Sequence, residues 1–521
     1  MRPPMRPLAE TNAHHRAPDL TLLPQDIFLM ILRYLSYIDV IHCRRASKSW
    51  NAAFGNPSNL YIFLKWNFPL AREISGRHQD EVLSNEHGIP RDDNNWRNLF
   101  NQISARYFHL RLGRPRSIER YKVWPSYTQN IRTGSKLYPV PPWEFHSSHL
   151  TSKPDRIFED CFWTYEDGLI VFVSRDDMCV LLLDLETSKT FTVPFDMDDK
   201  VMRRIRLQHR LLIIEWAEAD AFNWLNALDN VHRHFASSFD ITAVSPTGEW
   251  EITFRNEWKI MFLGHPLSNR DRFYSSHNGT HYVLYTWQPN RSLYTADEDA
   301  PIESLFVWDI SEPSDYRPST DPSSLHKPSS PGPFVVAKFT FRDLDFYSVR
   351  QRGAPKMIRL DIDSETNVLD ITESISPEYQ IELINTHRFP DVQVTSIPFL
   401  SHGPIWRRDL ELRMPPYRGN TSMYNRSIRS SYLWYMTISE AIDEEAQVFF
   451  SLQNSIPSYE DRKSAPRMEV IIRAPQFSNG FSRLESHLLP EVAFKGFVQG
   501  DERFVIGENE AQELVVLRFD R

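Results

Sequence analysis

Cysteine, glycine and long hydrophobic runs are scarce in this 521-residue sequence, which has 3 cysteines and 17 glycines. The cysteines Cys43, Cys161 and Cys179 form no C-x-x-C pair and are too few for a disulfide framework. We therefore expect a reducing compartment, cytoplasmic and/or nuclear. No run approaches the roughly 18 apolar residues of a membrane-spanning helix, and residues 1–19 lack the apolar stretch of a secretory signal. No membrane association is expected.

Positive charge and catalytic motifs are lacking as well. The formal net charge of −9 argues against a general nucleic-acid binder. The sequence has no phosphate-binding glycine loop, no H-E-x-x-H and no G-x-S-x-G. His146 and His149 have a spacing found in metal sites, but no third ligand is evident nearby. We expect no cofactor, no metal, no catalytic residue and a protein that is not an enzyme.

What the chain does have is aromatic residues, at 13%, and 36 prolines. This composition indicates an ordered chain with stiff turns, long enough for two or three domains. Residues 1–18 are the exception, because they are rich in proline, arginine and histidine and show no periodicity. We expect them to form a disordered arm.

Residues 19–66 predict three helical segments in a module with little core. Pro24 suits the first position of a helix, because its missing N–H would have no partner there. Ile27, Ile31 and Leu35 follow at four-residue intervals and form one apolar stripe, and Asp39 can cap a second segment. Exposed apolar surface on so small a module indicates a partner protein. The alternative is a helical subdomain packed against the rest of the chain.

These segments resemble the F-box, the trihelical module that binds the adaptor Skp1. The resemblance rests on the Leu-Pro opening and on the spacing of the apolar residues after it, and it covers under a tenth of the chain. It implies that the Skp1-binding residues are Leu23, Pro24, Ile27, Ile31, Leu35, Ile38, Val40, Cys43 and Trp50.

Residues 67–150 are expected to link this module to the rest of the chain. A helix is predicted between a cap at Asp93 or Asn94 and a stop at Gly113. Its apolar face would pack on the three-helix module or on the next domain, and it would comprise Trp96, Leu99, Phe100, Ile103, Tyr107 and Leu110. Residues 114–150 are rich in proline, tyrosine and tryptophan and predict an extended connection. Such a helix would fix the orientation of whatever follows it.

Residues 151–521 predict an all-β domain, because short apolar strands alternate with polar turns. Asp184, Asp309 and Asp361 each follow an apolar run, and such degenerate repeats are typical of a β-propeller, here WD-like. About six or seven blades fit the length. Ring closure would pair the strand near residues 515–519 with strands at 140–165. We therefore expect an α+β multidomain fold, with a β-sandwich plus extra sheets as the alternative for the second part.

Three polar inserts interrupt the predicted β-domain, at residues 311–333, 407–429 and 454–467. The first predicts a flexible loop. The second is basic and rich in tyrosine, and its arginines could bind an acidic or phosphorylated target; a solvated loop is the alternative. The candidate target-binding residues are Arg407, Arg408, Arg413, Tyr417, Arg418, Arg426 and Arg429.

The resemblance to F-box proteins implies a substrate-recognition subunit of a Skp1–cullin–F-box ubiquitin ligase. Skp1, and through it the cullin and RING subunits, would bind the F-box, and the β-domain would bind an unknown protein substrate. The alternative is a non-ligase interaction protein for which Skp1 is only a stabilising partner.

Overall fold

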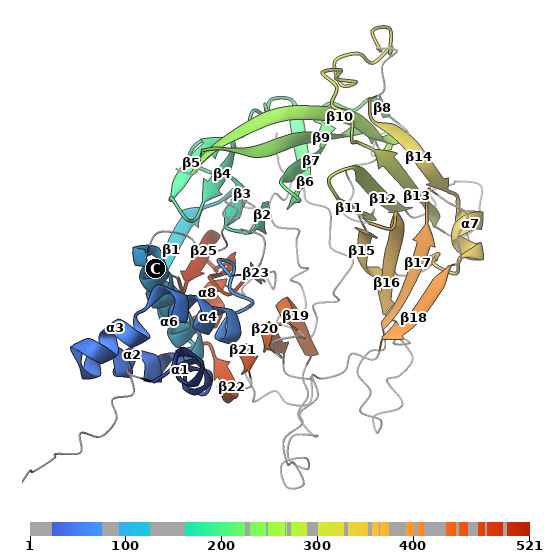
Figure 1. The fold of residues 1–521 in the computed structure, drawn as a ribbon. Coiled ribbons are helices and arrows are strands. Elements are labelled where there is room, and N and C mark those ends of the chain that lie inside the picture. Colours follow the sequence, from blue (N-terminus) through green and yellow to red (C-terminus); the bar gives the residue numbers. More distant parts are fainter. Residues whose placement is uncertain are drawn as a thin grey trace, which may run out of the picture.

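The computed structural model contains an N-terminal helical module and a larger β-rich body (Figure 1). The structure describes residues 23–74, 93–124, 162–224, 230–245, 248–265, 267, 272–288, 301–327, 332–352, 357–363, 365–374, 392–400, 405–410, 434–443, 448–456, 467–474, 477–492 and 498–520. The arm predicted at residues 1–18 lies outside these ranges. None of the helices within them is long and apolar enough to cross a membrane.

The described part of the helical module contains α1 (Gln25–Leu32), α2 (Tyr37–Ala46), α3 (Lys48–Phe54), α4 (Pro57–Asn67) and α6 (Asp93–Leu112). Ser36, not Asp39, caps α2: the Asp39 N–H donates to Ser36 Oγ at 3.2 Å, and the Ser36 N–H donates to Asp39 Oδ2 at 2.9 Å. This reciprocal pair is a capping box. The second predicted segment is two helices, because Ser47 has an extended backbone and caps α3.

The core of the module is built from all five helices. Phe28 and Leu32 of α1 point into it, and Phe63 of α4 packs against Phe100 of α6 with ring centroids 5.8 Å apart. Trp96, Phe100, Ile103 and Tyr107 of α6 are buried in the same cluster. The helix that the sequence predicted as a linker is therefore part of the core of the module.

The β-rich body consists, in its described part, of six antiparallel sheets, and in the first five the strands are consecutive in the chain. The first sheet is β2 (Trp163–Glu166), β3 (Leu169–Val173), β4 (Val180–Asp184) and β5 (Lys189–Thr192). The second is β6 (Lys200–Gln208), β7 (Leu211–Glu218), β9 (Asn230–Ser245) and β10 (Glu249–His265), with β8 (Asn223–Trp224) beside β9. The third is β11 (Arg272–His277), β12 (His281–Gln288), β13 (Ile302–Asp309) and β14 (Phe334–Phe339).

The remaining sheets complete the body. The fourth is β15 (Met357–Asp363), β16 (Val368–Ser374), β17 (Val392–Pro398) and β18 (Trp406–Leu410). The fifth is β19 (Trp434–Asp443), β20 (Val448–Ile456), β21 (Arg467–Ala474) and β22 (Phe477–Arg483). The sixth is β23 (Val498–Gly500), β24 (Phe504–Glu508), β25 (Glu513–Arg518) and β1 (Ser117–Lys122). Two short helices, α7 (Phe341–Phe346) and α8 (Leu489–Val492), lie between sheets in the sequence.

The six sheets follow one another around an arc (Figure 1). Buried apolar clusters join the first sheet to the second, the second to the third, the third to the fourth, the fifth to the sixth and the sixth to the first. Within the described ranges, no such cluster joins the fourth sheet to the fifth. The chain thus folds into several packed sheets rather than one continuous sheet.

The last strand pairs with a different part of the chain from the one predicted. β25 pairs with β1, in register from Ser117 opposite Arg518 to Lys122 opposite Glu513, and not with residues 140–165. In β1, half-buried residues alternate with exposed ones because it is an edge strand. Its polar, alternating sequence therefore carried no strong strand signal. The sixth sheet combines strands from both ends of the described chain.

The turns that follow acidic strand ends have a shared geometry. Asp184 accepts a hydrogen bond from the Glu186 N–H and Asp309 from the Ser311 N–H, both at 2.8 Å. In the fourth sheet this role belongs to Asp363, not to the predicted Asp361. Aspartate is favoured at these positions because its side chain bonds to the backbone two residues on.

The insert predicted as a flexible loop is packed on the β9–β10 hairpin over residues 311–319. The Ser314 N–H donates to the Arg255 carbonyl at 2.9 Å, and the Ser319 N–H donates to Glu257 at 3.0 Å. The Arg317 guanidinium lies 3.8 Å from the centre of the Phe254 ring. Proline and serine here form an ordered loop because the hairpin supplies hydrogen-bond partners for its backbone.

The end of α6 provides a test of the packing between the helical module and the body. Gly113 has a φ of +64°, and a Cβ there would lie 1.9 Å from the Arg483 carbonyl oxygen. We expect Gly113→Ala to lower the free energy of unfolding by about 2 kcal/mol or more. Gly279→Ala is the control, because nothing lies within 4 Å of its added Cβ, and it should change stability by less than about 0.5 kcal/mol. Urea unfolding of both variants decides the question, and equal effects would contradict this packing.

Candidate functional site

One face of helix α1 is apolar and open to solvent. Ile27, Met30 and Tyr34 are 45%, 62% and 83% exposed, and Ile31 between them is half-buried. Positions i, i+3, i+4 and i+7 share one face of a helix. The stripe predicted from Ile27 and Ile31 is therefore largely the outward face of α1, and Tyr34 continues it in the turn after the helix. We call Ile27, Met30, Ile31 and Tyr34 the α1 stripe.

The predicted Skp1-binding residues are unequally exposed. Pro24 and Ile27 are exposed, whereas the half-buried group comprises Leu23, Ile31, Leu35, Ile38, Cys43 and Trp50. Val40 has 0% exposure and lies in the core of the module, so it stabilises the fold and offers no surface to a partner. Met30 and Tyr34 were not among the predicted contacts, although the same helical periodicity includes them.

A cleft of about 610 Å³ lies between α2 and α6. Its lining is Tyr37, Ile38, Ile41, Arg44, Arg45, Asn51, Asn101, Ser104, Ala105, Phe108 and His109. Arg44 donates to Asn101 Oδ1 at 3.1 Å, and its guanidinium lies 5.5 Å from the centre of the Phe100 ring. The cleft combines apolar walls with arginines, a pattern that fits the apolar face of a helix bearing acidic residues.

A buried ionic network joins the helical module to the β-rich body. Arg106 of α6, whose side chain is 3% exposed, pairs with Glu73 and donates to Glu502 Oε1 at 2.5 Å. Tyr107 donates to the other oxygen of Glu502 at 2.7 Å. Glu502 lies in the turn between β23 and β24. Burial raises the pKa of Glu502 while Arg106 opposes that rise, and burial also raises the pKa of Tyr107 well above its ordinary value. Tyr107 therefore remains a hydrogen-bond donor.

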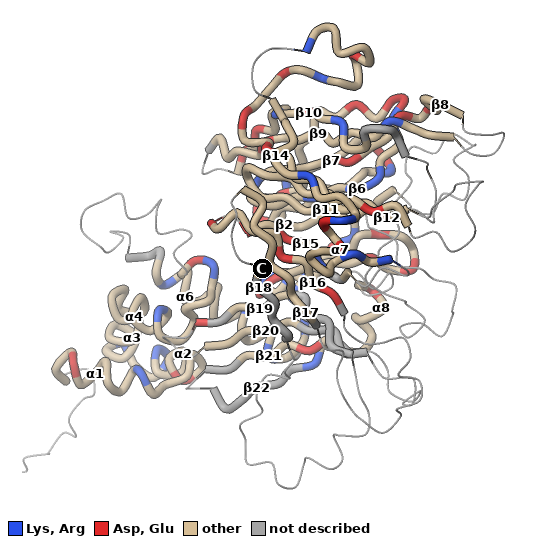
Figure 2. The backbone as a smooth tube through the Cα atoms, turned by 90° about the vertical axis from the view of Figure 1, so that its right-hand side faces the viewer, with Lys and Arg blue, Asp and Glu red and all other residues tan. Residues whose placement is uncertain are grey.

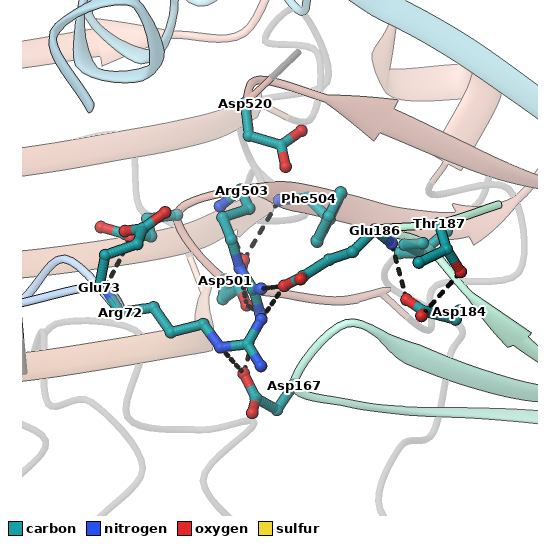
Figure 3. Close-up of polar contacts among 12 residues, drawn as sticks. Arg72, Glu73, Asp167, Asp184, Glu186, Thr187, Asp501, Arg503, Phe504 and Asp520 are labelled. Carbon is teal, nitrogen blue, oxygen red and sulfur yellow. Dashed lines mark hydrogen bonds and ion pairs between the residues drawn. The ribbon is translucent and has the colours of Figure 1, made fainter. Parts of the chain in front are cut away.

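A second set of charges continues this network between the module and the first and sixth sheets (Figure 3). Arg72, which follows α4, pairs with Glu186 and with Asp167 at 3.0 Å. Arg503 of the β23–β24 turn contacts the same two carboxylates at 2.9 and 3.0 Å and Asp501 at 2.7 Å. Burial opposes ionisation of Asp501, but Arg503 holds the pKa of its carboxyl below the ordinary value. The guanidiniums of Arg72 and Arg503 thus share the carboxylates of Asp167 and Glu186, and Arg503 also contacts Asp501.

These contacts hold the module in one orientation on the body. The network ties the segment after α4, helix α6 and two sheets together, and Leu110 of α6 packs in the apolar cluster of the fifth and sixth sheets. Removing one partner of a buried ion pair leaves an uncompensated charge, which costs several kcal/mol. Rotating the helical module on the body would separate these ion pairs and carry the same free-energy cost. The α1 stripe and the cleft are therefore presented at a fixed angle to the β-rich body.

The predicted target-binding loop is only partly described. Arg407 and Arg408 lie on strand β18, opposite Thr395 and Val394 of β17, so they belong to the fourth sheet and not to a loop. The sequence analysis did not predict this strand because the residues around Arg407 and Arg408 are polar. The other candidates lie outside the described residues: Arg413, Tyr417, Arg418, Arg426 and Arg429.

The described residues give no candidate for metal chemistry. They contain no group of three or more His, Cys, Asp or Glu side chains placed to hold an ion, and His146 and His149 lie outside them. Burial raises the pKa of both described cysteines, Cys43 and Cys179. Neither thiol is therefore activated as a nucleophile, since the thiolate is the reactive form.

Comparison with known proteins agrees with the geometry of the helical module. Residues 20–61 match the family model of the F-box domain. The match covers α1, α2, α3 and the first part of α4, and so includes the α1 stripe and the α2 wall of the cleft. No curated protein matches the chain. The chain thus carries an N-terminal F-box, and F-box proteins are generally non-catalytic adaptor subunits that bind Skp1.

The ionic network can be tested by removing its central cation. Arg106→Met leaves Glu502 and Glu73 without their guanidinium, and we expect it to lower the free energy of unfolding by about 3 kcal/mol. Arg120→Met is the matched control, because the Arg120–Glu491 pair is exposed and should contribute less than about 1 kcal/mol. Denaturant unfolding of the full chain measures both. A loss below 1 kcal/mol for Arg106→Met would show that the network does not hold the module in place.

Proposed function

We propose that the protein is a substrate-recognition subunit of a Skp1–cullin–F-box ubiquitin ligase. The observation that carries the proposal is the exposed apolar α1 stripe within the residues that match the F-box. Burying an apolar side chain of this size stabilises a complex by about 1.5–3 kcal/mol. A folded module that leaves Ile27, Met30 and Tyr34 in water therefore has binding energy available for Skp1.

The cleft between α2 and α6 supplies a second part of the same interface. Its apolar side chains accept the face of an amphipathic helix, and Arg44 and Arg45 attract acidic residues beside that face. Because α6 forms one wall, Skp1 would contact the helix that is tied to the β-rich body. The cullin and RING subunits would then assemble on Skp1.

The β-rich body would be a six-bladed, WD-like β-propeller. Three features support this architecture: six sheets of four strands each, with a fifth strand in only the second of them, strands consecutive in the chain in the first five sheets, and the pairing of β1 with β25 in the sixth. In a propeller, mixing strands from both ends of the chain in one blade closes the ring. The propeller would bind the protein substrate.

The receptor itself would perform no bond chemistry. It would raise the effective concentration of the substrate lysines near the ubiquitin-conjugating enzyme, an effect that depends on geometry. The ionic network around Arg106 and Arg503 supports this function because it fixes the angle between the Skp1-binding module and the body. The protein would act in the cytoplasm, the nucleus or both.

The Skp1 interface is tested by placing charge on the exposed face of α1. We expect Ile27→Asp combined with Met30→Asp to weaken binding of purified Skp1 at least about 100-fold, because two apolar contacts are lost. Calorimetry measures the affinity, and the melting temperature should stay unchanged because both side chains are exposed. Phe346→Asp, on exposed α7 of the body, is the control and should bind Skp1 normally. Wild-type affinity in the double variant would contradict the assignment.

Reconstitution separates the ligase from the non-ligase alternative. Cullin, RING subunit, ubiquitin-conjugating enzyme and ubiquitin are added to the Skp1-bound chain together with proteins captured from a lysate. A ligase receptor transfers ubiquitin to a captured protein, and the α1 double variant does not. Binding of Skp1 without any transfer would leave a protein that uses Skp1 as a stabilising partner.

A further inference from the structure

Two exposed aromatic side chains lie at strand β8 of the body: Trp224 within the strand and Phe222 in the bend just before it. Phe222 and Trp224 are each 62% exposed and lie two residues apart in the sequence. The segment is fixed by β9: the Phe222 N–H donates to the Val231 carbonyl at 2.8 Å, and Trp224 lies opposite Asn230. In Figure 2, β8 lies on the side of the body away from helices α1 to α4. We call Phe222, Trp224 and their surroundings the β8 surface.

Exposure sets Trp224 apart from other tryptophans of the chain. The described tryptophans that are buried are Trp96, Trp163, Trp216, Trp258 and Trp308. Trp224 is the one tryptophan among the exposed large apolar side chains of the described residues. Solvent exposure of an indole contributes nothing to a core, whereas tryptophan is enriched where interfaces gain most of their binding energy.

The base of the surface is held by an ion pair. The Arg233 guanidinium lies 5.6 Å from the centre of the Phe222 ring and 5.8 Å from that of Phe235. Its Nε donates to Glu218 Oε2 at 2.6 Å. Arg233 is therefore fixed between two rings, and Phe222 is supported from one side while its other side remains exposed. A supported aromatic side chain loses little conformational entropy when a partner binds.

Exposed carboxylates lie on the segment that contacts the residues just before β8. The segment before β6 carries exposed Asp196, Asp198 and Asp199, and Asp220 is exposed two residues before Phe222. The Ala219 N–H donates to the Asp199 carbonyl at 3.0 Å, which brings this segment beside the start of β8.

Two of the described cations in this region, Lys200 and Arg233, face aromatic rings. Lys200 lies 5.2 Å from the centre of the Trp216 ring, and Arg233 is paired with Glu218. Lys259 has its pKa lowered by burial and by the nearby Arg233. Glu218 is neutralised by its pair with Arg233, whereas Asp199 and Asp220 are exposed beside the start of the segment, so the β8 surface carries exposed negative charge as well as aromatic rings.

We propose that the β8 surface binds the protein substrate through a basic segment of that substrate. A lysine or arginine side chain would lie over the exposed faces of Trp224 and Phe222, where the ring quadrupole attracts a cation. Asp199 and Asp220 would face its charge and favour basic over acidic partners. The inference deepens the proposed function, since it names the chemistry of the substrate and the place on the body where it binds.

The probe is a fluorescein-labelled peptide of alternating arginine and serine, compared with one of alternating glutamate and serine. Fluorescence anisotropy is measured with the full chain bound to Skp1. We expect the basic peptide to bind and the acidic one not to bind. Trp224→Ala should weaken the basic peptide at least about tenfold. Asp199→Asn combined with Asp220→Asn should also weaken it and reduce its dependence on salt.

Two matched variants separate this surface from the general attraction of an acidic protein for cations. Glu312→Gln with Asp315→Asn removes the same charge from the exposed loop of residues 311–327, and Phe346→Ala removes an exposed aromatic ring elsewhere. Both should bind the basic peptide like the wild type. The inference is overturned if the wild type does not bind the basic peptide, if Trp224→Ala binds it normally, or if the matched variants weaken it equally.

The same samples keep this inference distinct from the F-box proposal. Peptide binding that depends on Trp224 while Skp1 fails to co-purify would retain the β8 surface and remove the adaptor function. Skp1 binding without Trp224-dependent peptide binding would retain the adaptor and overturn the β8 surface.

Discussion

The ion pair between Arg106 and Glu502 is the contact on which the arrangement of this protein depends. It is buried, it is continued by Glu73 and Tyr107, and it joins a helix near the start of the chain to a turn near its end. Such a pair contributes less to net stability than to fixing one geometry, because its charges are costly in any other arrangement. The second set of charges around Arg503 extends the same constraint to the first sheet.

Because the helical module has a fixed orientation on the body, its exposed apolar stripe and the β8 surface have a fixed position relative to each other. The helical module buries Phe28 and Leu32 in its own core. It leaves the apolar side chains of Ile27, Met30 and Tyr34 exposed to solvent, where a partner protein can cover them. The β8 surface lies on the other side of the body (Figure 2). The proposed receptor would need two such surfaces and a stiff connection between them, and the ionic network would provide that connection.

Local sequence patterns predicted the helical N-terminal module and the β-rich character of residues 151–521 because periodicity is a local property, but they did not predict α7 and α8 or the break between α2 and α3. Pro24 and the four-residue spacing of Ile27 and Ile31 led to the F-box, yet the same spacing did not show that Val40 is buried. Long-range contacts could not be predicted, because Arg72 and Glu502 are 430 residues apart. The polar sequence of β1 likewise gave no sign that this segment pairs with β25. The order of the loop that begins at residue 311 was missed because it also depends on a distant contact. Its Arg317 packs on the ring of Phe254 in β10.

The orientation of the helical module on the body is the central claim, and a distance measurement tests it most directly. Spin labels at Ala52 of α3 and Thr190 of β5, both exposed, are placed in a chain whose native cysteines are replaced by serine. Pulsed electron paramagnetic resonance should give one narrow distance distribution, unchanged when Skp1 binds and broadened by Arg106→Met. A broad distribution in the chain with Arg106 intact would contradict the account.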